Sequence, residues 1–283
     1  MPVTFARADL LANPAWVAQN LSNPALHVLD CRWRVDGSGA RSHAVGHVPG
    51  SIYVDWAADL SESGATGTQQ LAPPAAFAAA MSRAGVDDGK TVVLLDDTQS
   101  LFAARAWWSL LAYGFTAAAI LDGGWQGWLE AGLPVSGAAT KVEPTNFHPR
   151  PDARRRVTSA ELLTLVRAGE AQLVDARTPA EYLGQGGPGP RRGHLPRAVN
   201  LPAALLAEAG GQALPTAVKL ARLFAQRGLD DERPVIAYDT SGVGAAKLAF
   251  CLELMGFGTV AVYDAGWTDW AARPADEGFT IEL

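Results

Sequence analysis

The strongest constraint in this sequence is an internal repeat. Four short segments of the first half recur in the same order in the second half of the 283 residues. The pairs are LDCR at 29–32 with VDAR at 174–177, GHVP at 46–49 with GHLP at 193–196, GVDD at 85–88 with GLDD at 228–231, and DGGW at 122–125 with DAGW at 264–267. Because the spacing between partners changes by only a few residues, we infer two copies of one structural unit with small loop insertions.

The repeat also indicates where one copy ends and the next begins. Gly132 and Pro134 close the first copy, and the proline-rich stretch after them has no clear period, which is typical of a linker. Thr158 and Glu161 form a capping-box pattern ahead of an apolar run, so a helix is expected to open the second copy. We therefore expect a first domain at residues 1–134, a linker at residues 135–156 and a second domain at residues 157–283.

Each copy alternates helical segments with short apolar strands. The strongest strands are expected at residues 91–95 and 235–238, and each is followed by a short loop and an apolar helix. Strands that are apolar throughout and alternate with helices indicate a parallel sheet with helices on both faces. Binding sites in such sheets lie beyond the carboxyl ends of the strands. The loops after these two strands are therefore the first places to look for function.

The loop after the second of these strands has the composition of an anion site. It reads Asp239-Thr240-Ser241-Gly242-Val243-Gly244. Its backbone N–H groups precede a helix, where they lack helical partners, and its two glycines permit the positive φ that a tight concave loop needs. The alternative is a plain strand-to-helix turn in which Asp239 or Thr240 caps the helix.

Composition argues against several classes of protein. The formal net charge of −6 gives no support to nucleic-acid binding. The two cysteines, Cys31 and Cys251, form no CxxC or Cys/His spacing, so we expect neither a disulfide framework nor a metal site, and a cytoplasmic location fits best. The first residues show no export signal and no run is long enough to span a membrane, so no membrane association is expected. No organic cofactor is expected either.

Taken together, these features resemble the two-domain rhodanese sulfurtransferases. The resemblance runs along nearly the whole chain and rests on DCRW at 30–33, GHVPG at 46–50, RAWW at 105–108, LDGGW at 121–125, DAR at 175–177 and PRRGHLP at 190–196. It implies an α/β fold of two tandem rhodanese-like domains, each a parallel five-stranded sheet with helices on both faces. It also implies transfer of sulfane sulfur from thiosulfate or 3-mercaptopyruvate to a thiophilic acceptor, with catalysis in the second domain.

Asp239 departs from the pattern of that family. The mercaptopyruvate branch reads Cys-Gly-Ser-Gly-Val-Thr in this loop, so the resemblance puts Asp239 at the position of the nucleophilic cysteine. A carboxylate cannot hold a persulfide, and neither Cys31 nor Cys251 is placed to replace the thiol. We expect the Asp239 carboxylate to accept the loop N–H groups as a built-in anion with a lowered pKa, and Asp97 to be its counterpart in the first copy. Sulfur transfer is then impaired or absent.

The resemblance also assigns residues on the substrate side. Arg177 is expected to bind the substrate anion or to pair with Asp239, Arg191 to face the same pocket, and Trp33 to lean over it from the first domain. The other residues expected at the anion are Thr240, Ser241, Gly242, Val243 and Gly244. The expected partner is a small anionic sulfur compound or a protein. Two alternatives stay open: a binding or regulatory module that uses the inter-domain anion pocket, and a different reaction that depends on Asp239.

Overall fold

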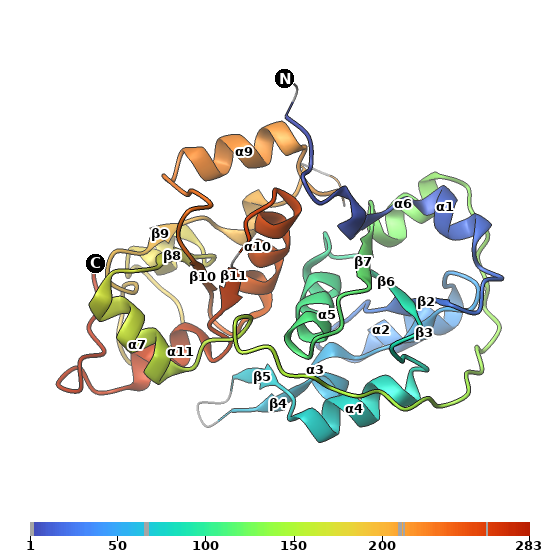
Figure 1. The fold of residues 1–283 in the computed structure, drawn as a ribbon, viewed down its shortest axis with the longest axis horizontal. Coiled ribbons are helices and arrows are strands. Elements are labelled where there is room, and N and C mark those ends of the chain that lie inside the picture. Colours follow the sequence, from blue (N-terminus) through green and yellow to red (C-terminus); the bar gives the residue numbers. More distant parts are fainter. Residues whose placement is uncertain (1–2, 65–67, 209–210, 212, 259) are drawn as a thin grey trace.

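The computed structural model describes residues 3–64, 68–208, 211, 213–258 and 260–283. It shows two α/β halves side by side (Figure 1). The elements of the first half are η1 (Ala8–Leu10), β1 (Leu11–Ala12), α1 (Pro14–Gln19), β2 (Leu26–Asp30), α2 (Ser38–Val45), β3 (Ile52–Tyr53), α3 (Trp56–Asp59), β4 (Ser61–Ser63), β5 (Gln69–Leu71), α4 (Pro74–Arg83), β6 (Thr91–Leu95), α5 (Leu101–Ala112), β7 (Ala118–Leu121) and α6 (Gly124–Glu130). Those of the second half are α7 (Ser159–Ala168), β8 (Gln172–Asp175), α8 (Pro179–Tyr182), β9 (Val199–Asn200), η2 (Ala203–Leu205), α9 (Ala217–Ala225), β10 (Val235–Tyr238), α10 (Val243–Leu254), β11 (Val260–Val262) and α11 (Gly266–Ala272).

Each half contains one parallel sheet, and the two strand orders correspond. The first sheet has the order β1-β7-β6-β2-β3 and the second has the order β11-β10-β8-β9. Beside β11, where the first sheet has β1, the described residues form only an isolated parallel bridge between Arg156 and Val262. The prediction of five strands is confirmed for the first sheet and wrong for the second, because pairing at this edge is reduced to that single bridge. A short antiparallel pair, β4-β5, lies outside both sheets.

Both faces of each sheet are buried under helices. In β6, Val92 and Leu94 belong to the apolar cluster that includes α4 and α5, whereas Val93 and Leu95 belong to the cluster with α1 and α6. Successive side chains of a strand point to opposite faces, so this division shows that both faces are covered. The strand β10 divides in the same way between α9 and α10 on one face and α7 and α11 on the other. The predicted α/β fold with helices on both faces is confirmed.

The halves meet through two equivalent helices. Figure 1 shows α5 and α10 facing each other in the middle of the molecule, and their rings interlock where Trp107 lies edge-on to Phe250 with centroids 4.9 Å apart. One apolar cluster runs through residues of both halves. Because the shared cluster is as buried as a domain core, this contact holds the halves in one arrangement, unlike the more polar contacts typical of mobile domains.

The segment between the halves is mostly irregular. Residues 135–156 form no helix or sheet strand, but their end is tied to the second sheet. Val157 N donates to Val262 O, and Val262 N donates to Arg155 O, both at 3.0 Å. The Arg155 guanidinium also pairs with Glu253 at the buried end of α10. The linker therefore ends as part of the second half.

Candidate active-site loop

Asp239 follows β10 directly, and α10 begins at Val243. The N-cap residue of α10, Gly242, has φ of 88°, a conformation that glycine adopts without steric cost. The turn gathers three backbone N–H groups around the Asp239 carboxylate. Ser241 N and Gly244 N donate at 3.1 and 2.7 Å, and Gly242 N donates as well. The prediction that Asp239 serves as a built-in anion for this loop is confirmed.

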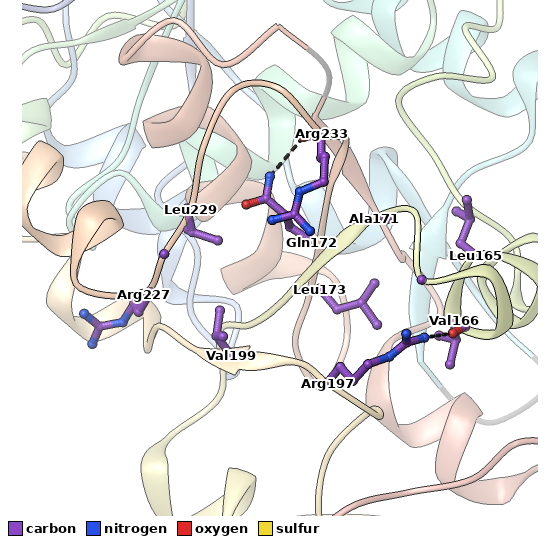
Figure 2. Close-up of a pocket in the computed structure, with 12 residues that line it drawn as sticks. Leu165, Val166, Ala171, Gln172, Leu173, Arg197, Val199, Arg227, Leu229 and Arg233 are labelled. Carbon is purple, nitrogen blue, oxygen red and sulfur yellow. Dashed lines mark hydrogen bonds between the residues drawn. The ribbon is translucent and has the colours of Figure 1, made fainter.

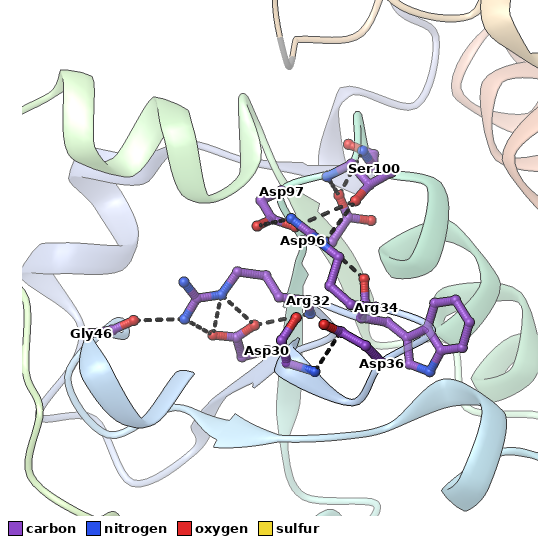
Figure 3. A network of polar contacts seen from close by, with 11 residues as sticks. Asp30, Arg32, Arg34, Asp36, Gly46, Asp96, Asp97 and Ser100 are labelled. Carbon is purple, nitrogen blue, oxygen red and sulfur yellow. Dashed lines mark hydrogen bonds and ion pairs between the residues drawn. The ribbon is translucent and has the colours of Figure 1, made fainter. Parts of the chain in front are cut away.

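The first half contains the same arrangement around Asp96. This residue follows β6 and is almost fully buried. Its carboxylate accepts four backbone N–H groups at 2.7–2.9 Å, from Thr98, Ser100, Phe102 and Ala103. Figure 3 shows Asp96 with Ser100 beside it. A carboxylate therefore fills the N–H cradle in both copies of the repeat.

Asp97 plays a different part from the one predicted. Its carboxylate pairs with Arg34 at 2.8 Å, away from the cradle (Figure 3). The counterpart of Asp239 is therefore Asp96, and the predicted equivalence of Asp97 is wrong by one residue. The cause is that the loop before α5 is longer by one residue than the loop before α10, since α5 begins at Leu101 and α10 at Val243.

The protonation of Asp239 also differs from the prediction. Burial raises the pKa of its carboxyl above the ordinary value, and the N–H groups of Gly244, Gly242 and Ser241 only partly oppose this effect. Burial raises the pKa of Asp96 in the same way. The expected lowering is therefore wrong, because desolvation of the charged form outweighs the hydrogen bonds that favour it.

Arg177 is bound to a neighbour in sequence rather than to Asp239. Its guanidinium pairs with Asp175 at 2.5 Å, donates to Gly193 O at 2.8 Å and lies 4.2 Å from the Trp267 ring. Both partners of the ion pair are buried. The prediction that Arg177 pairs with Asp239 is wrong, because Asp175 stands two residues away at the same strand end and accepts both Nε and Nη2 of the guanidinium.

The first half repeats this ion pair. Arg32 pairs with Asp30 at 2.7 Å and donates to Gly46 O (Figure 3). Its guanidinium lies 4.3 Å from the Trp125 ring. Because the arrangement occurs in both halves, it serves the shared fold. In the second half, one guanidinium nitrogen of Arg177, Nη1, has no hydrogen-bond partner among the described residues.

Arg191 does not face the loop either. Its guanidinium donates to four backbone carbonyl oxygens near the end of the chain, those of Trp270, Ala271, Arg273 and Phe279. All of these distances lie between 2.6 and 3.0 Å. Arg191 therefore holds the C-terminal segment in place, and its expected contact with the pocket is absent because nearer acceptors use its donors.

A pocket of about 290 Å³ opens beside Asp239, between the two halves. The first half contributes Leu101. The second half contributes Ala176, Arg177, Thr178, Glu181, Pro202, Ala203, Ala204, Asp239, Thr240, Val243 and Gly244. Of the predicted site residues, the pocket brings together Asp239, Thr240, Val243, Gly244 and Arg177. Trp33 lies outside its walls, where it packs edge-on against Trp56 and Phe102.

Thr178 and Glu181 line this pocket and were not predicted. Glu181 accepts the Thr178 N–H and hydroxyl in a capping box at the start of α8. The three-residue spacing of Thr178 and Glu181 is a capping-box pattern, and it could have predicted a helix start close to the end of β8. Glu181 therefore adds a second carboxylate to a pocket that already contains Asp239.

The charge of this pocket is the reverse of an anion site. Two carboxylates, Glu181 and Asp239, line it, whereas the charge of its one arginine, Arg177, is compensated by Asp175. An anion entering here meets two negative groups, and like charges this close disfavour binding. The pocket suits a neutral or positively charged group better.

The first half reaches the loop through a buried ion pair. Arg105 of α5 pairs with Asp264 at 2.6 Å, and neither side chain is exposed. The same guanidinium donates to Gly242 O at 3.5 Å and to Gln69 O at 3.2 Å. The Asp264 carboxylate also accepts Leu71 N. Arg105 and Asp264 therefore fix the loop of the second half against the first.

Another pocket, of about 270 Å³, lies in the second half near the start of β8 (Figure 2). Three arginines, Arg197, Arg227 and Arg233, line it above an apolar floor that includes Leu173 and Leu229. In Figure 2 the Arg227 side chain extends away from the other two. The guanidinium groups of Arg197 and Arg227 donate to backbone carbonyls, those of Val166 in α7 and Asn200 in β9. This pocket is separate from the loop at Asp239.

The described residues offer neither a cluster of metal ligands nor a membrane-spanning helix. No group of three or more His, Cys, Asp or Glu side chains among them is arranged to hold a metal ion. Within the same residues, no helix has both the length and the apolar character needed to cross a bilayer.

Comparisons with known proteins agree with this fold. The family model described as a rhodanese-like domain matches residues 13–131 and 158–273. The 3-mercaptopyruvate sulfurtransferase of Escherichia coli (strain K12) is 32% identical over 267 residues, which is 91% of this chain and 93% of the relative. The thiosulfate sulfurtransferase of Rattus norvegicus is 30% identical over 280 residues, 94% of this chain and 93% of the relative. The crystal structure of a 3-mercaptopyruvate sulfotransferase from Escherichia coli matches with a TM-score of 0.82 at 29% identity, covering 91% of this chain and 98% of that one.

The matches define a protein built from two rhodanese-like domains in tandem. The chain belongs to the two-domain rhodanese sulfurtransferase family, as the sequence motifs predicted.

Proposed function

We propose that this chain is a binding member of the sulfurtransferase family that has lost sulfur transfer. The observation that carries the proposal is the Asp239 carboxylate, which accepts three backbone N–H groups of its loop. These are the donors that a helix-capping loop offers to a bound anion or thiolate. With Asp239 in place, the loop has no nucleophilic sulfur and no free N–H cradle.

Sulfur transfer by this fold needs a thiolate that takes up sulfane sulfur as a persulfide. Neither cysteine of the chain supplies it. Cys31 and Cys251 are both fully buried, and burial raises the pKa of Cys251 to about 12 and that of Cys31 well above its ordinary value. Thiols that are neither ionised nor accessible do not react with a small sulfur donor.

The pocket beside Asp239 supports binding of a small molecule. It has walls from both halves, a volume of about 290 Å³ and a few polar groups among apolar side chains, which is the usual make-up of a ligand site. Glu181 and Asp239 make it acidic. The proposed ligand is therefore a neutral or cationic small molecule, and not the anionic sulfur compound expected from the family.

The experiment is a comparison of the wild-type protein with Asp239→Cys in cyanide-dependent thiocyanate formation. We expect no turnover and no added sulfur in the intact mass of the wild type after thiosulfate treatment. Asp239→Cys should gain one sulfur and partial turnover, because the turn and the helix N-terminus lower the pKa of a thiol placed there. Thiosulfate should serve as donor better than 3-mercaptopyruvate.

Asp96→Cys is the matched control, since Asp96 sits in the same N–H cradle. Asp96 is only 1% exposed, whereas Asp239 borders the pocket. A sulfur donor therefore reaches a cysteine at position 239 and not one at position 96. A wild-type protein that forms a persulfide even when Cys31 and Cys251 are both replaced would overturn the proposal.

A second measurement tests the charge of the pocket. Calorimetric titration with thiosulfate should show only weak binding to the wild type, because Glu181 and Asp239 repel the anion. Asp239→Asn removes one of these charges and should strengthen thiosulfate binding at least tenfold, which corresponds to about 1.4 kcal/mol. Equal binding by the two proteins would contradict the acidic-pocket argument.

A further inference from the structure

The repeat places one histidine identically in both halves. His47 Nδ1 contacts His43 O at 2.8 Å, and His194 Nδ1 contacts Tyr182 O at 2.9 Å. Each imidazole also stacks on the side chain of the residue that provides the carbonyl. The same hydrogen bond therefore holds the histidine of each copy in place. Because a carbonyl only accepts, Nδ1 carries the hydrogen and Nε2 is left for another partner.

In the second half, the chain itself supplies that partner. Glu282 pairs with His194 through backbone hydrogen bonds in both directions. Its carboxylate lies 3.8 Å from His194 Nε2 and accepts Arg197 N at 2.9 Å. A carboxylate of the protein therefore occupies the space next to the imidazole and receives a backbone N–H.

In the first half, a serine stands where Glu282 would be. His47 pairs with Ser136 through the same two backbone hydrogen bonds, but the serine side chain is short and its Oγ accepts Ala138 N. His47 Nε2 has no hydrogen-bond partner among the described residues although His47 is only 1% exposed. Gly50, the counterpart of Arg197, donates its N–H to none of the described residues.

Ser51, the next residue after Gly50, adds another polar group without a partner among the described residues. Ser51 is fully buried, and its Oγ likewise has no partner within the described part of the chain. Its counterpart in the second half is Ala198, which has no hydroxyl. Leaving a buried polar atom without a partner costs free energy, so two such atoms on residues that line the same pocket indicate a site for a polar ligand.

His47 and Ser51 line a pocket of about 300 Å³ that is distinct from the one at Asp239, and Gly50 directly precedes Ser51 in the chain. Its lining consists of His43, Ala44, His47, Ser51, Ile52, Tyr53, Gly137, Ala139 and Thr140. Asp30, the carboxylate that contacts His43 of this lining, is also paired with Arg32, so its negative charge is already compensated. The apolar part of the lining has room for a short hydrocarbon chain.

We propose that this pocket binds a small monocarboxylate, whose carboxylate takes the place that the Glu282 side chain takes in the second half. Its oxygens accept the Ser51 hydroxyl and the Gly50 N–H, and share one proton with His47 Nε2. Its hydrocarbon part lies against Ile52 and Ala139. The inference does not depend on the proposed role of Asp239, because the two sites share no residue.

The test is an NMR titration of protein labelled with ¹⁵N-histidine, using propionate as the probe and propionamide as its neutral isostere. The chain has five histidines, so the ring nitrogens are resolvable and His47→Gln assigns its own signals. We expect propionate to shift the His47 Nε2 resonance with a single saturable affinity. Propionamide should bind at least tenfold more weakly, because it lacks the charge.

The repeat suggests test variants, because each half shows a residue that the fold tolerates at the equivalent position of the other half. Ser136→Glu places a glutamate in the first half at the position equivalent to Glu282. Its carboxylate should compete with propionate and weaken propionate binding at least tenfold. Ser51→Ala introduces the residue of Ala198 and should weaken binding about tenfold through loss of one hydrogen bond to a charged group. In Glu282→Ser, propionate should shift the His194 Nε2 resonance as well.

Two results would overturn the proposal. Equal binding of propionate by the wild type and Ser136→Glu, with Ser136→Glu folded as judged by its histidine spectrum, would overturn the proposal. No shift of the His47 resonance at any propionate concentration would overturn it too, and would leave ordered water as the partner of these groups. The outcome of the thiosulfate experiments at Asp239 has no bearing on either result.

Discussion

Replacement of Arg105 by methionine tests how the two halves are held together. The Arg105 guanidinium is completely buried and pairs with Asp264 of the second half. It also lies 4.7 Å from the Trp108 ring. Methionine keeps much of the apolar stem but removes the charge and the donors. The change therefore leaves the buried Asp264 carboxylate without its closest partner.

The magnitude follows from what remains around Asp264. Breaking a buried ion pair from one side costs about 3–5 kcal/mol, because the other charge stays desolvated. Leu71 N and Arg156, whose Nε lies 3.3 Å from the carboxylate, remain and compensate part of the charge. We therefore expect the free energy of unfolding to fall by about 3 kcal/mol, near the lower end of this range. In a chain of this size, this fall lowers the thermal unfolding midpoint by roughly 6 °C.

The assay is urea unfolding followed by tryptophan fluorescence, for Arg105→Met, Asp264→Asn and the double variant. The double variant should be more stable than Arg105→Met alone, since it removes the uncompensated carboxylate. Lys247 is the matched control, because it occupies the position of Arg105 on α10, is 2% exposed and forms no ion pair with a described residue. Lys247→Met should be neutral or stabilising. A loss below about 1 kcal/mol for Arg105→Met, or equal midpoints for the single and double variants, would refute the reasoning.

Two further predictions concern stability. Burial raises the pKa of Glu253 to about 7, against the lowering effect of Arg155. The folded chain therefore keeps this proton to higher pH than the unfolded chain, in which the pKa of the glutamate is near 4.5. The free energy of unfolding should then fall as the pH rises between these two values. Urea midpoints measured at pH 5 and pH 8 should show a smaller fall in Glu253→Gln than in the wild type. A Cβ at Gly193 would lie 2.0 Å from Glu282 O, at a φ of 116°, so Gly193→Ala should cost about 2–4 kcal/mol in thermal unfolding. Gly186→Ala, whose Cβ would meet nothing within 4 Å, should stay within about 0.5 kcal/mol, and similar losses for the two would contradict the steric argument.

Local patterns predicted much of the fold. The strand expected at 91–95 is β6, and the strand expected at 235–238 is β10. Both strands are apolar on both faces, so their signal is the same whichever face is considered. The capping box at Thr158 is formed as predicted. These features depend on neighbours within a few residues, which the sequence displays directly.

Features that depend on long-range packing were missed. The partners of Arg191 lie near the end of the chain, and nothing in its own loop indicates them. The hydrogen bonds of Asp239 are local and were foreseen, but its burial comes from the surrounding structure, and burial decides the direction of its pKa. For Arg177 a signal existed: the spacing of Asp175 and Arg177 repeats at Asp30 and Arg32, which indicates a structural pair in both halves.

The bridge between Arg156 and Val262 has a consequence for any shortened form of this protein. The main-chain groups of Val262 are paired with Arg155 and Val157, so the segment that joins the halves also covers the outer edge of β11. A fragment that starts after Arg156 would leave Val262 N without its acceptor, Arg155 O, at the edge of β11, and open edges pair with other chains. A cut after Arg155 would therefore leave the second sheet with an edge that favours aggregation, whereas a cut earlier in the linker keeps that edge covered.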